Sequence, residues 1–245
     1  MSFSYPTLTH QGTHIGYIRS VNEDALFVNE KEGLWVVADG MGGHSRGDKA
    51  SRIVVDHCKS YCQCDSLEES ISDIEARLSM ANQACRSLYD KEILGSTVAA
   101  LLIFQSKATL VWAGDSRIYR LREGTLNLLT EDHNLAQERC RRGEMSQDEA
   151  QRLPSANVLT RAVGVHQDLR LQVHDVEVAP GDRYLLSTDG LYRELTQQDL
   201  QDILRGPLGQ SVMTQLIGKA LDKGGKDNIT GVLVEIQESA TGPKN

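Results

Sequence analysis

The sequence contains no apolar run long enough to cross a membrane. The longest, Val98 to Phe104, is far shorter than the roughly 20 residues that a spanning helix needs. The first residues, Met1 to Gln11, are polar and include no apolar segment of the kind found in a secretory signal. The sequence therefore predicts a cytoplasmic protein with no membrane partner.

A disulfide framework and an excess of positive charge are also missing. The five cysteines are an odd number, and a chain of 245 residues can bury a sufficient core without covalent cross-links. A reducing compartment is the simplest expectation. Acidic residues outnumber basic ones by 34 to 26, which gives a formal net charge of −8. This balance argues against a general nucleic-acid partner, because binding nucleic acid requires a positive field.

Linkers and internal repeats are absent too. No segment rich in proline, serine or glycine interrupts the chain before its last residues, and no self-similarity appears at the periods of repeat proteins. We therefore expect one domain over residues 1–238. Residues 239–245 are small and polar, and we expect them to form a disordered tail.

Short runs of β-branched and aromatic residues, each bounded by turn residues, predict strands. They cover residues 25–29, 34–38, 97–104, 108–113, 117–122, 125–129, 169–178, 184–187 and 229–236. Tight turns join several of them, which implies antiparallel sheets.

Helices are predicted between these strands. Residues 67–88 carry apolar side chains at alternating spacings of four and three, which form one stripe on a helix. Ser66 and Glu69 can form a capping box at its start. Further helices are expected at 47–61 and 210–221. Together the elements predict an α+β fold, an αββα sandwich in which helices flank two antiparallel sheets.

A polar segment, 130–156, separates two groups of predicted strands. It contains several arginines and a short helix capped by Ser146. Its length suits a functional flap beside an active site. An ordinary helical hairpin on the surface explains the segment equally well, and the sequence does not decide between the two.

Four aspartates stand where apolar runs end or begin. Asp39, Asp115 and Asp189 each close an apolar run, and Asp227 precedes the last predicted strand. Since each run has the composition of a buried strand, each carboxylate is expected at the end of a rigid, buried strand. A single Asp-Gly after a strand is more often a turn than a ligand, and spacing alone does not show that the four carboxylates meet.

Carboxylates that do meet require a cation. They repel one another, and their pKa values rise unless positive charge neutralises them. Mg²⁺ and Mn²⁺ prefer oxygen ligands in octahedral geometry, and the glycine after Asp39 lets a backbone carbonyl approach such an ion. Zinc is disfavoured, because no histidine and cysteine set has its usual spacing.

Seven sequence blocks, in the same order, resemble the metal-dependent protein phosphatases of the protein phosphatase 2C family in their compact bacterial form. They span about residues 10 to 236. The blocks run from Arg19 to Asp24, Val36 to Gly43, Gly95 to Thr97, Gly114 to Arg117, Asn157 to Gly164, Ser187 to Leu191 and Asp227 to Thr230.

The resemblance implies a serine/threonine protein phosphatase that uses two Mn²⁺ or Mg²⁺ ions. Asp39 would bridge both ions. The carbonyl of Gly40 would complete one site, and Asp189 and Asp227 would complete the other. By the same resemblance, the reaction is direct attack on phosphorus by a hydroxide that bridges the ions, so none of the five cysteines has to act as a nucleophile.

Further roles follow from the same resemblance. Glu23 and Asp24 match an acidic pair that holds metal-bound waters or reaches a metal directly. Asp115, with Asp189, matches a third and weaker metal position of bacterial members. Arg19 matches the arginine that grips the substrate phosphate with its planar fork of donors. The catalytic set implied in this way is Arg19, Asp24 and Asp39.

One position departs from many eukaryotic relatives. Met41 stands where they carry a histidine that has been proposed as the acid for the leaving group, and methionine cannot donate a proton. His44 is close in sequence but occupies a different motif position, so the role is not assigned to it. Bacterial relatives commonly carry methionine here, and the identity of the acid stays open.

Two other functions compete with a general phosphatase. A non-catalytic relative that only binds phosphoproteins should have lost a metal aspartate, whereas Asp39, Asp189 and Asp227 are all present. A phosphatase dedicated to one regulatory protein, such as an anti-sigma-type partner, would carry the same motifs, because substrate choice resides in other surfaces. The resemblance implies phosphorylated protein substrates and a separate serine/threonine kinase, in some relatives one that controls secretion. We expect the chain to act as a monomer.

Overall fold

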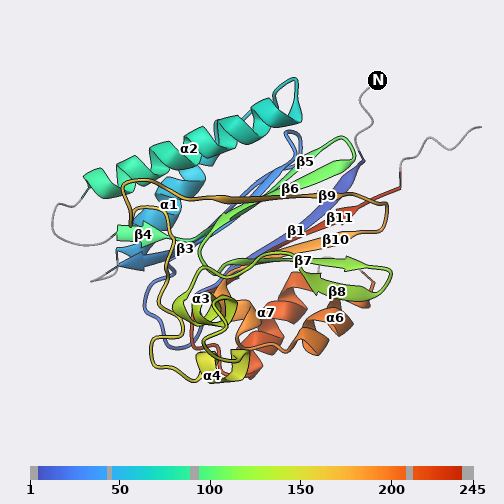
Figure 1. Cartoon of the computed structure of the whole chain (residues 1–245). Helices are drawn as coiled ribbons and strands as arrows, with labels where there is room; N and C mark the ends of the chain where they lie inside the picture. The colour runs from blue at the N-terminus through green and yellow to red at the C-terminus, as the bar shows by residue number, and fades with distance from the viewer. Residues whose placement is uncertain (1–4, 43–45, 89–93, 208–211, 239–245) are drawn as a thin grey trace, which may run out of the picture.

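The computed structural model describes residues 5–42, 46–88, 94–207 and 212–238. Two antiparallel β-sheets are stacked face to face, and helices cover the outer face of each sheet (Figure 1). This arrangement is the predicted αββα sandwich. Among the described residues, none of the helices has the length and apolar character needed to cross a membrane. The predicted tail, 239–245, lies outside the described residues.

One sheet has five strands in the order β1-β11-β10-β7-β8. Their bounds are β1 Thr7–His14, β7 Arg117–Arg122, β8 Thr125–Leu128, β10 Arg183–Ser187 and β11 Ile229–Ile236. Strand β11 therefore lies between β1 and β10, and it pairs with β1 along its whole length. Strand β1 was not predicted from the sequence.

The other sheet has the order β2-β3-β5-β6-β9, with the short strand β4 paired to the end of β3. The bounds are β2 Asp24–Asn29, β3 Leu34–Gly42, β4 Leu94–Ser96, β5 Val98–Phe104, β6 Lys107–Ala113 and β9 Gln172–Glu177. Strand β9 is shorter than the predicted 169–178. The other predicted strands appear within one or a few residues of their expected bounds.

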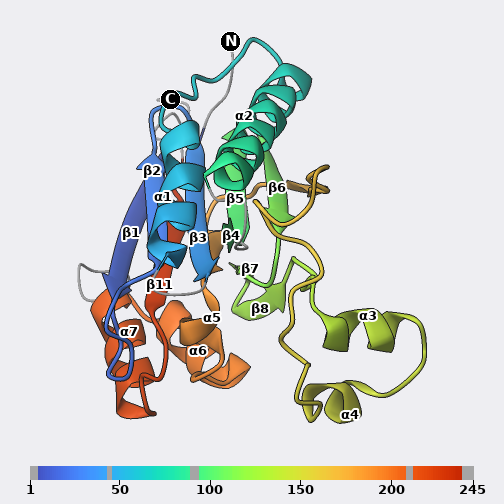
Figure 2. The ribbon, with the colours of Figure 1, turned by 90° about the vertical axis from the view of Figure 1, so that its left-hand side faces the viewer.

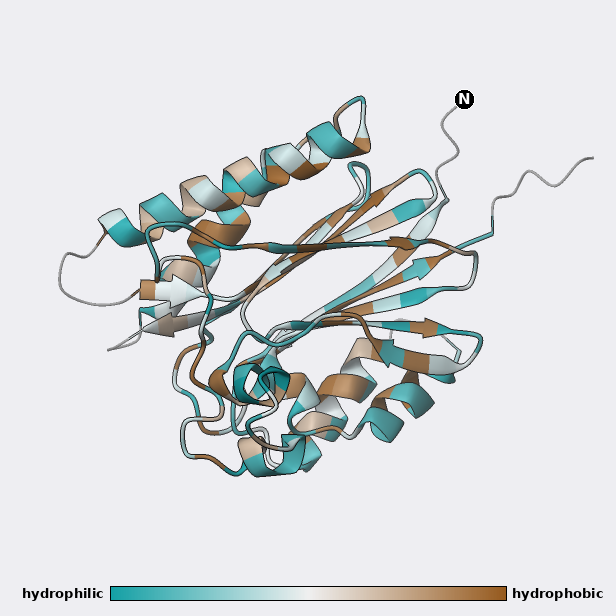
Figure 3. Ribbon diagram, viewed as in Figure 1, coloured by the Kyte–Doolittle hydropathy of each residue, from teal (hydrophilic) through white to brown (hydrophobic). Residues whose placement is uncertain are grey.

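The inner strands consist mainly of apolar residues because both of their faces are buried. In β3, Leu34 and Val36 pack toward the covering helices, whereas Trp35 and Val37 pack between the sheets. Alternate side chains of a strand point to opposite faces, so burial of both faces produces a continuous apolar run rather than an alternating one. Figure 3 shows this as brown strands in the middle of the sandwich.

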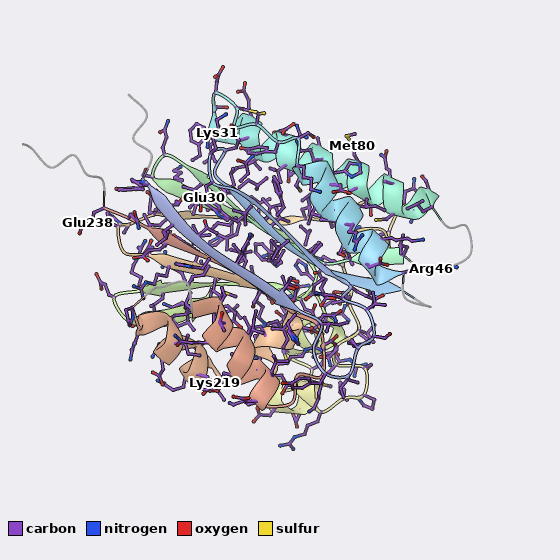
Figure 4. All side chains as sticks on the ribbon, turned by 180° about the vertical axis from the view of Figure 1, so that it is seen from behind. Glu30, Lys31, Arg46, Met80, Lys219 and Glu238 are labelled. Carbon is purple, nitrogen blue, oxygen red and sulfur yellow. The ribbon has the colours of Figure 1, made fainter. Side chains whose placement is uncertain are left out.

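Two helices cover the β2–β9 sheet and three cover the other. The first two are α1 Gly47–Cys58 and α2 Leu67–Ser87, and the others are α5 Asp189–Tyr192, α6 Gln197–Arg205 and α7 Val212–Asp222. Ser66 caps α2 as predicted, since its side chain accepts a hydrogen bond from the Glu69 amide at 3.2 Å. The outer helix faces carry polar residues such as Lys219 on α7, and the exposed Met80 on α2 is an apolar exception on the opposite side of the molecule (Figure 4).

The segment predicted as a flap forms two short helices, α3 Leu135–Arg141 and α4 Gln147–Gln151. They extend to one side of the sandwich (Figure 2). Ala136, Ala150 and Ala156 form a small apolar cluster of their own. The segment is thus a helical hairpin in form, and its role as a flap stays a prediction.

Candidate active site

The four strand-end aspartates come together at one end of the sandwich. Asp39 belongs to β3 and Asp115 follows β6, so both come from one sheet, whereas Asp189 follows β10 and Asp227 precedes β11 in the other. All four line one pocket of about 340 Å³. The antiparallel strands deliver these residues to the same edge, although they are far apart in the sequence.

The remaining predicted residues lie at the same place. Arg19, Glu23 and Gly40 line the pocket. Asp24 lies directly opposite Asp39 in the β2–β3 pair, and its Oδ2 accepts a hydrogen bond from the Thr188 hydroxyl at 2.8 Å. The structure therefore brings all eight residues of the predicted site together, seven in the pocket wall and Asp24 beside it.

Asn228 fixes the loop that carries Arg19 and Glu23. Its Oδ1 accepts from the Glu23 amide at 2.8 Å. Its Nδ2 donates to the carbonyls of Ile15 at 2.8 Å and Val21 at 3.0 Å. One buried amide side chain thus ties residues 15–23 to the start of β11. The sequence analysis includes Asn228 in a family block but assigns it no role.

Glu23 and Arg19 already have partners in the pocket. The Glu23 carboxylate accepts from the Gly47 amide at 2.9 Å, at the start of α1, where the unpaired amides of a helix favour negative charge. The Arg19 fork donates to both oxygens of Asp227, at 2.8 and 2.7 Å. The Arg19 side chain is 51% exposed, so it can turn toward a ligand that enters from solvent.

Two further residues were missed by sequence reasoning. The Thr97 hydroxyl accepts from the Asp39 amide at 2.9 Å, and the Thr97 amide donates to the Asp39 carbonyl at 2.9 Å. These bonds fix the backbone from which the Asp39 side chain projects. Arg193 lies between Asp115 and Asp189 and pairs with both. Thr97 belongs to a family block but was given no role there, and Arg193 lies two residues after the block that ends at Leu191.

Met41 and His133 do not supply an acid in the described pocket. Met41 lines the pocket and has no proton to give. His133 is buried and stacks on Trp112 with 6.0 Å between ring centroids, and it is not among the pocket residues. His44 lies outside the described residues.

Four carboxyl groups of the site, those of Asp24, Asp39, Asp115 and Asp189, have raised pKa values. Burial raises the pKa of Asp24 to about 7, and the nearby charges of Asp189 and Asp227 act in the same direction. Burial and Asp189 also raise the pKa of Asp115 to about 7, against the opposing effect of Arg193. The pKa of Asp39 is raised well above its usual range by burial and then by the neighbouring Asp24. Close carboxylates in a buried site therefore disfavour one another's charge.

This donor set fits hard divalent cations. Asp24 Oδ1 and Asp189 Oδ1 are buried and have no hydrogen-bond partner, although buried carboxylate oxygens normally have one. All candidate ligands are oxygens, which Mg²⁺ and Mn²⁺ prefer.

The carboxylates are not yet gathered around one point. In the described part of the chain, no three acidic, histidine or cysteine side chains already form a ligand set. We attribute this to Arg19, which occupies both oxygens of Asp227, whereas Arg193 pairs with Oδ2 of Asp189 and leaves its Oδ1 without a partner. Side-chain rotation would accompany the binding of ions here. The evidence for a metal site is therefore the chemistry of the oxygen donors rather than their present positions.

Gly40 is required by the close approach of two backbone segments. A Cβ atom on this residue would lie 1.9 Å from the Gly47 carbonyl oxygen and 2.7 Å from that of Glu23. Gly40→Ala is expected to separate β3 from the start of α1 and to lower the free energy of unfolding by roughly 1–3 kcal/mol. Urea denaturation of the variant and the parent protein in EDTA measures this change.

Gly218→Ala provides the control for Gly40→Ala. Gly218 lies in α7, and a Cβ atom there meets nothing within 4 Å. Since alanine is the better helix former, this variant is expected to gain about 0.5–1 kcal/mol. Equal stability of Gly40→Ala and the parent protein would contradict the close approach described at Gly40.

Comparison with known proteins identifies the family. The model of the protein phosphatase 2C family matches residues 12–222. The chain belongs to the protein phosphatase 2C family. It is 35% identical over 235 residues to the serine/threonine phosphatase stp of Listeria welshimeri, which covers 91% of this chain and 93% of that protein.

Solved structures of this family agree with the fold. The Pseudomonas aeruginosa protein PppA, described as a key regulatory component of T6SS, superposes with a TM-score of 0.86 at 36% identity, covering 96% of this chain and 99% of that one. The catalytic domain of the phosphatase PstP in complex with two manganese ions superposes with a TM-score of 0.83 at 29% identity, covering 95% and 99%. The predicted family, fold and enzyme class are thereby confirmed, and the metal-bound relative supports metal dependence.

Proposed function

We propose that this protein phosphatase 2C hydrolyses phosphoserine and phosphothreonine in proteins with two divalent cations, Mn²⁺ or Mg²⁺, at the pocket between the sheet ends. Asp39 would bridge the ions, the Gly40 carbonyl would complete one site, and Asp189 and Asp227 would complete the other. The observation that carries the proposal is the convergence of six carboxylates, two of them with unpartnered buried oxygens, in a single pocket region.

The chemistry that such ions supply when bound is a water molecule with a pKa near neutrality and a counter-charge for the phosphate. The chain's own residues would bind and orient the substrate phosphate and the water molecules. Arg19, once it releases Asp227, can place two donors on phosphate oxygens in the geometry that a guanidinium favours. Glu23 and Asp24 are suited to hold water molecules through their carboxylates, with Glu23 fixed by Gly47 and Asp24 by Thr188.

The composition of the pocket supports attack by water rather than by a side chain. The described lining contains no cysteine and no histidine. Its one hydroxyl-bearing residue, Thr97, accepts from the Asp39 amide and bonds the Ser116 hydroxyl at 2.7 Å. The buried Cys58 and Cys85 thiols have pKa values raised by burial, to about 12 and about 11, so neither forms a thiolate near neutral pH.

Phosphate release from a phosphothreonine peptide at pH 7.5 tests the proposal. Turnover is expected with Mn²⁺ or Mg²⁺ and is expected to disappear in EDTA. Asp189→Asn should lower kcat/KM by at least roughly 10³-fold, as expected when a major electrostatic contact of the transition state is lost.

Asp175→Asn makes the same charge change on β9, where Asp175 accepts a hydrogen bond from Thr109 at 2.7 Å. It should keep the parent activity. A folded, cation-loaded protein that releases no phosphate from any peptide or aryl phosphate would refute the proposal and favour a binding role.

The biological setting is part of the same proposal. We expect residues 1–238 to act as one catalytic domain and as a monomer, opposite a separate serine/threonine kinase. The similarity to PppA over nearly the whole of both chains supports a substrate within a secretion system. Dephosphorylation of one secretion-system protein, with other phosphoproteins unchanged in the cells that carry the chain, would distinguish this dedicated role from a general one.

A further inference from the structure

Arg193 occupies the place predicted for a third metal ion. Its Nη2 lies 3.0 Å from Asp115 Oδ2, and its Nη1 lies 2.8 Å from Asp189 Oδ2. These two aspartates are the pair that matches the third metal position of bacterial relatives. One planar guanidinium therefore bridges both carboxylates, with a separate donor for each.

Several contacts fix Arg193 in this position. It follows the one-turn helix α5 and stands four residues after Asp189, and its amide donates to the Asp189 carbonyl at 2.9 Å. The preceding Tyr192 donates its hydroxyl to the Asp115 carbonyl at 2.8 Å. The guanidinium carbon of Arg117 lies 3.8 Å from the centre of the Tyr192 ring. The backbone and side chain of Asp115 are thus both held by consecutive residues.

Charge balance requires a cation at this point. The Asp115 side chain is 6% exposed and the Asp189 side chain 12%, and two buried carboxylates next to each other are costly without a positive partner. Arginine remains charged at every pH at which a protein is folded. A divalent ion between the same carboxylates would have to displace Arg193 and break both of its ion pairs.

We infer that Arg193 is the resident cation of the third position, so that this phosphatase binds two divalent ions where relatives with a free carboxylate pair can bind three. The inference rests on the proposed function only for the two-ion site. Arg193 also lines the neighbouring pocket, of about 360 Å³, beside the α3–α4 hairpin. This space allows the side chain to swing away, and a third ion would then enter only at high concentration.

Counting bound ions tests the inference without an activity assay. Equilibrium dialysis at pH 7.5 and up to millimolar Mn²⁺, with the bound metal measured by mass spectrometry, should give two ions for the parent protein. Arg193→Met removes the charge and keeps an unbranched chain, and this variant should bind a third ion at least about tenfold more tightly than the parent. Arg193→Lys keeps a positive charge and should remain at two.

Second variants assign the extra ion. Arg193→Met combined with Asp115→Asn should return to two ions, and Asp115→Asn alone should leave the parent count at two. The ion count of Asp115→Asn keeps the inference testable if circular dichroism shows that Arg193→Met is unfolded. Three ions in the parent protein, one of them lost in Asp115→Asn, would overturn the inference, as would two ions in a folded Arg193→Met. A parent protein that binds no Mn²⁺ would instead contradict the two-ion function itself.

Discussion

Asp39→Asn is expected to remove nearly all phosphatase activity and, in EDTA, to make the protein more stable. Activity should fall by at least roughly 10³-fold, because the variant loses the carboxylate expected to bridge both ions. Stability should rise by about 1–3 kcal/mol, since a neutral amide replaces a buried charge beside other carboxylates. Asp24 on β2 lies opposite Asp39. The charges of Asp24, Asp189 and Asp115 are all close enough to raise the pKa of Asp39.

Thermal unfolding in EDTA at pH 7.5 measures the effect, which corresponds to a rise in Tm of roughly 2–4 °C per kcal/mol for a chain of this size. Asp182→Asn is the matched control. Asp182 is also buried, but it accepts two hydrogen bonds from Arg122, both at 2.6 Å, and one from the Ala179 amide at 2.9 Å.

Asp182→Asn removes a satisfied charge and should destabilise the protein by about 1–3 kcal/mol. If Asp39→Asn lowered the Tm in EDTA as Asp182→Asn does, the carboxylates of the pocket would not be repelling one another.

The stability of the protein is expected to depend on pH in opposite directions with and without metal. In EDTA, Asp24 and Asp115 have folded-state pKa values of about 7, above the 3.8 of an ordinary aspartate. The folded protein therefore holds protons that the unfolded chain has released. These protons stabilise the folded state at low pH. Their contribution to the free energy of unfolding is lost as the pH rises from about 4 through 7, by up to roughly 4 kcal/mol for each carboxyl.

Divalent ions reverse this slope, because they bind deprotonated carboxylates and bind more tightly as the pH rises. Urea denaturation between pH 6.5 and 8 should show falling stability in EDTA and rising stability with saturating Mn²⁺. The lower limit avoids His133, whose pKa is lowered by burial and which contributes the opposite slope at lower pH. Asp115→Asn should flatten the EDTA curve, and a curve in EDTA that rises with pH in the parent protein would contradict the raised pKa values.

The elements that the sequence predicted well are those whose own composition decides their structure. The first five residues of β3, 34–38, are one unbroken apolar run, and α2 has a complete apolar stripe with Ser66 at its start. Strand β1 was missed because Thr7–His14 contains a single aliphatic residue, Leu8, and its structure is decided by pairing with all eight residues of β11. Helix α6 buries only Leu200 and Leu204, and its capping box of Thr196 and Asp199 was the overlooked signal.

The residues of the candidate site also fall into those that the sequence predicts and those that only the fold brings together. Aspartates that close apolar runs could be identified from the chain, and the family's blocks then related them to one another. Arg193 could not be identified, because its proximity to Asp189 is local but its proximity to Asp115 exists only after β6 and β10 are in their two sheets. The Asn228 bonds to residues 15–23 likewise join opposite ends of the chain. Contacts of this kind depend on the fold and leave no periodic pattern.

The place of β11 in its sheet also determines when the enzyme can first act. A protein leaves the ribosome with its amino-terminal end first, so β11 is the last strand of the sandwich to emerge, together with Asp227 and Asn228. Before then β1 lacks the strand with which it pairs, and the loop that carries Arg19 lacks its hydrogen bonds to Asn228. We therefore expect a nascent chain to be inactive for as long as β11 remains in the exit tunnel.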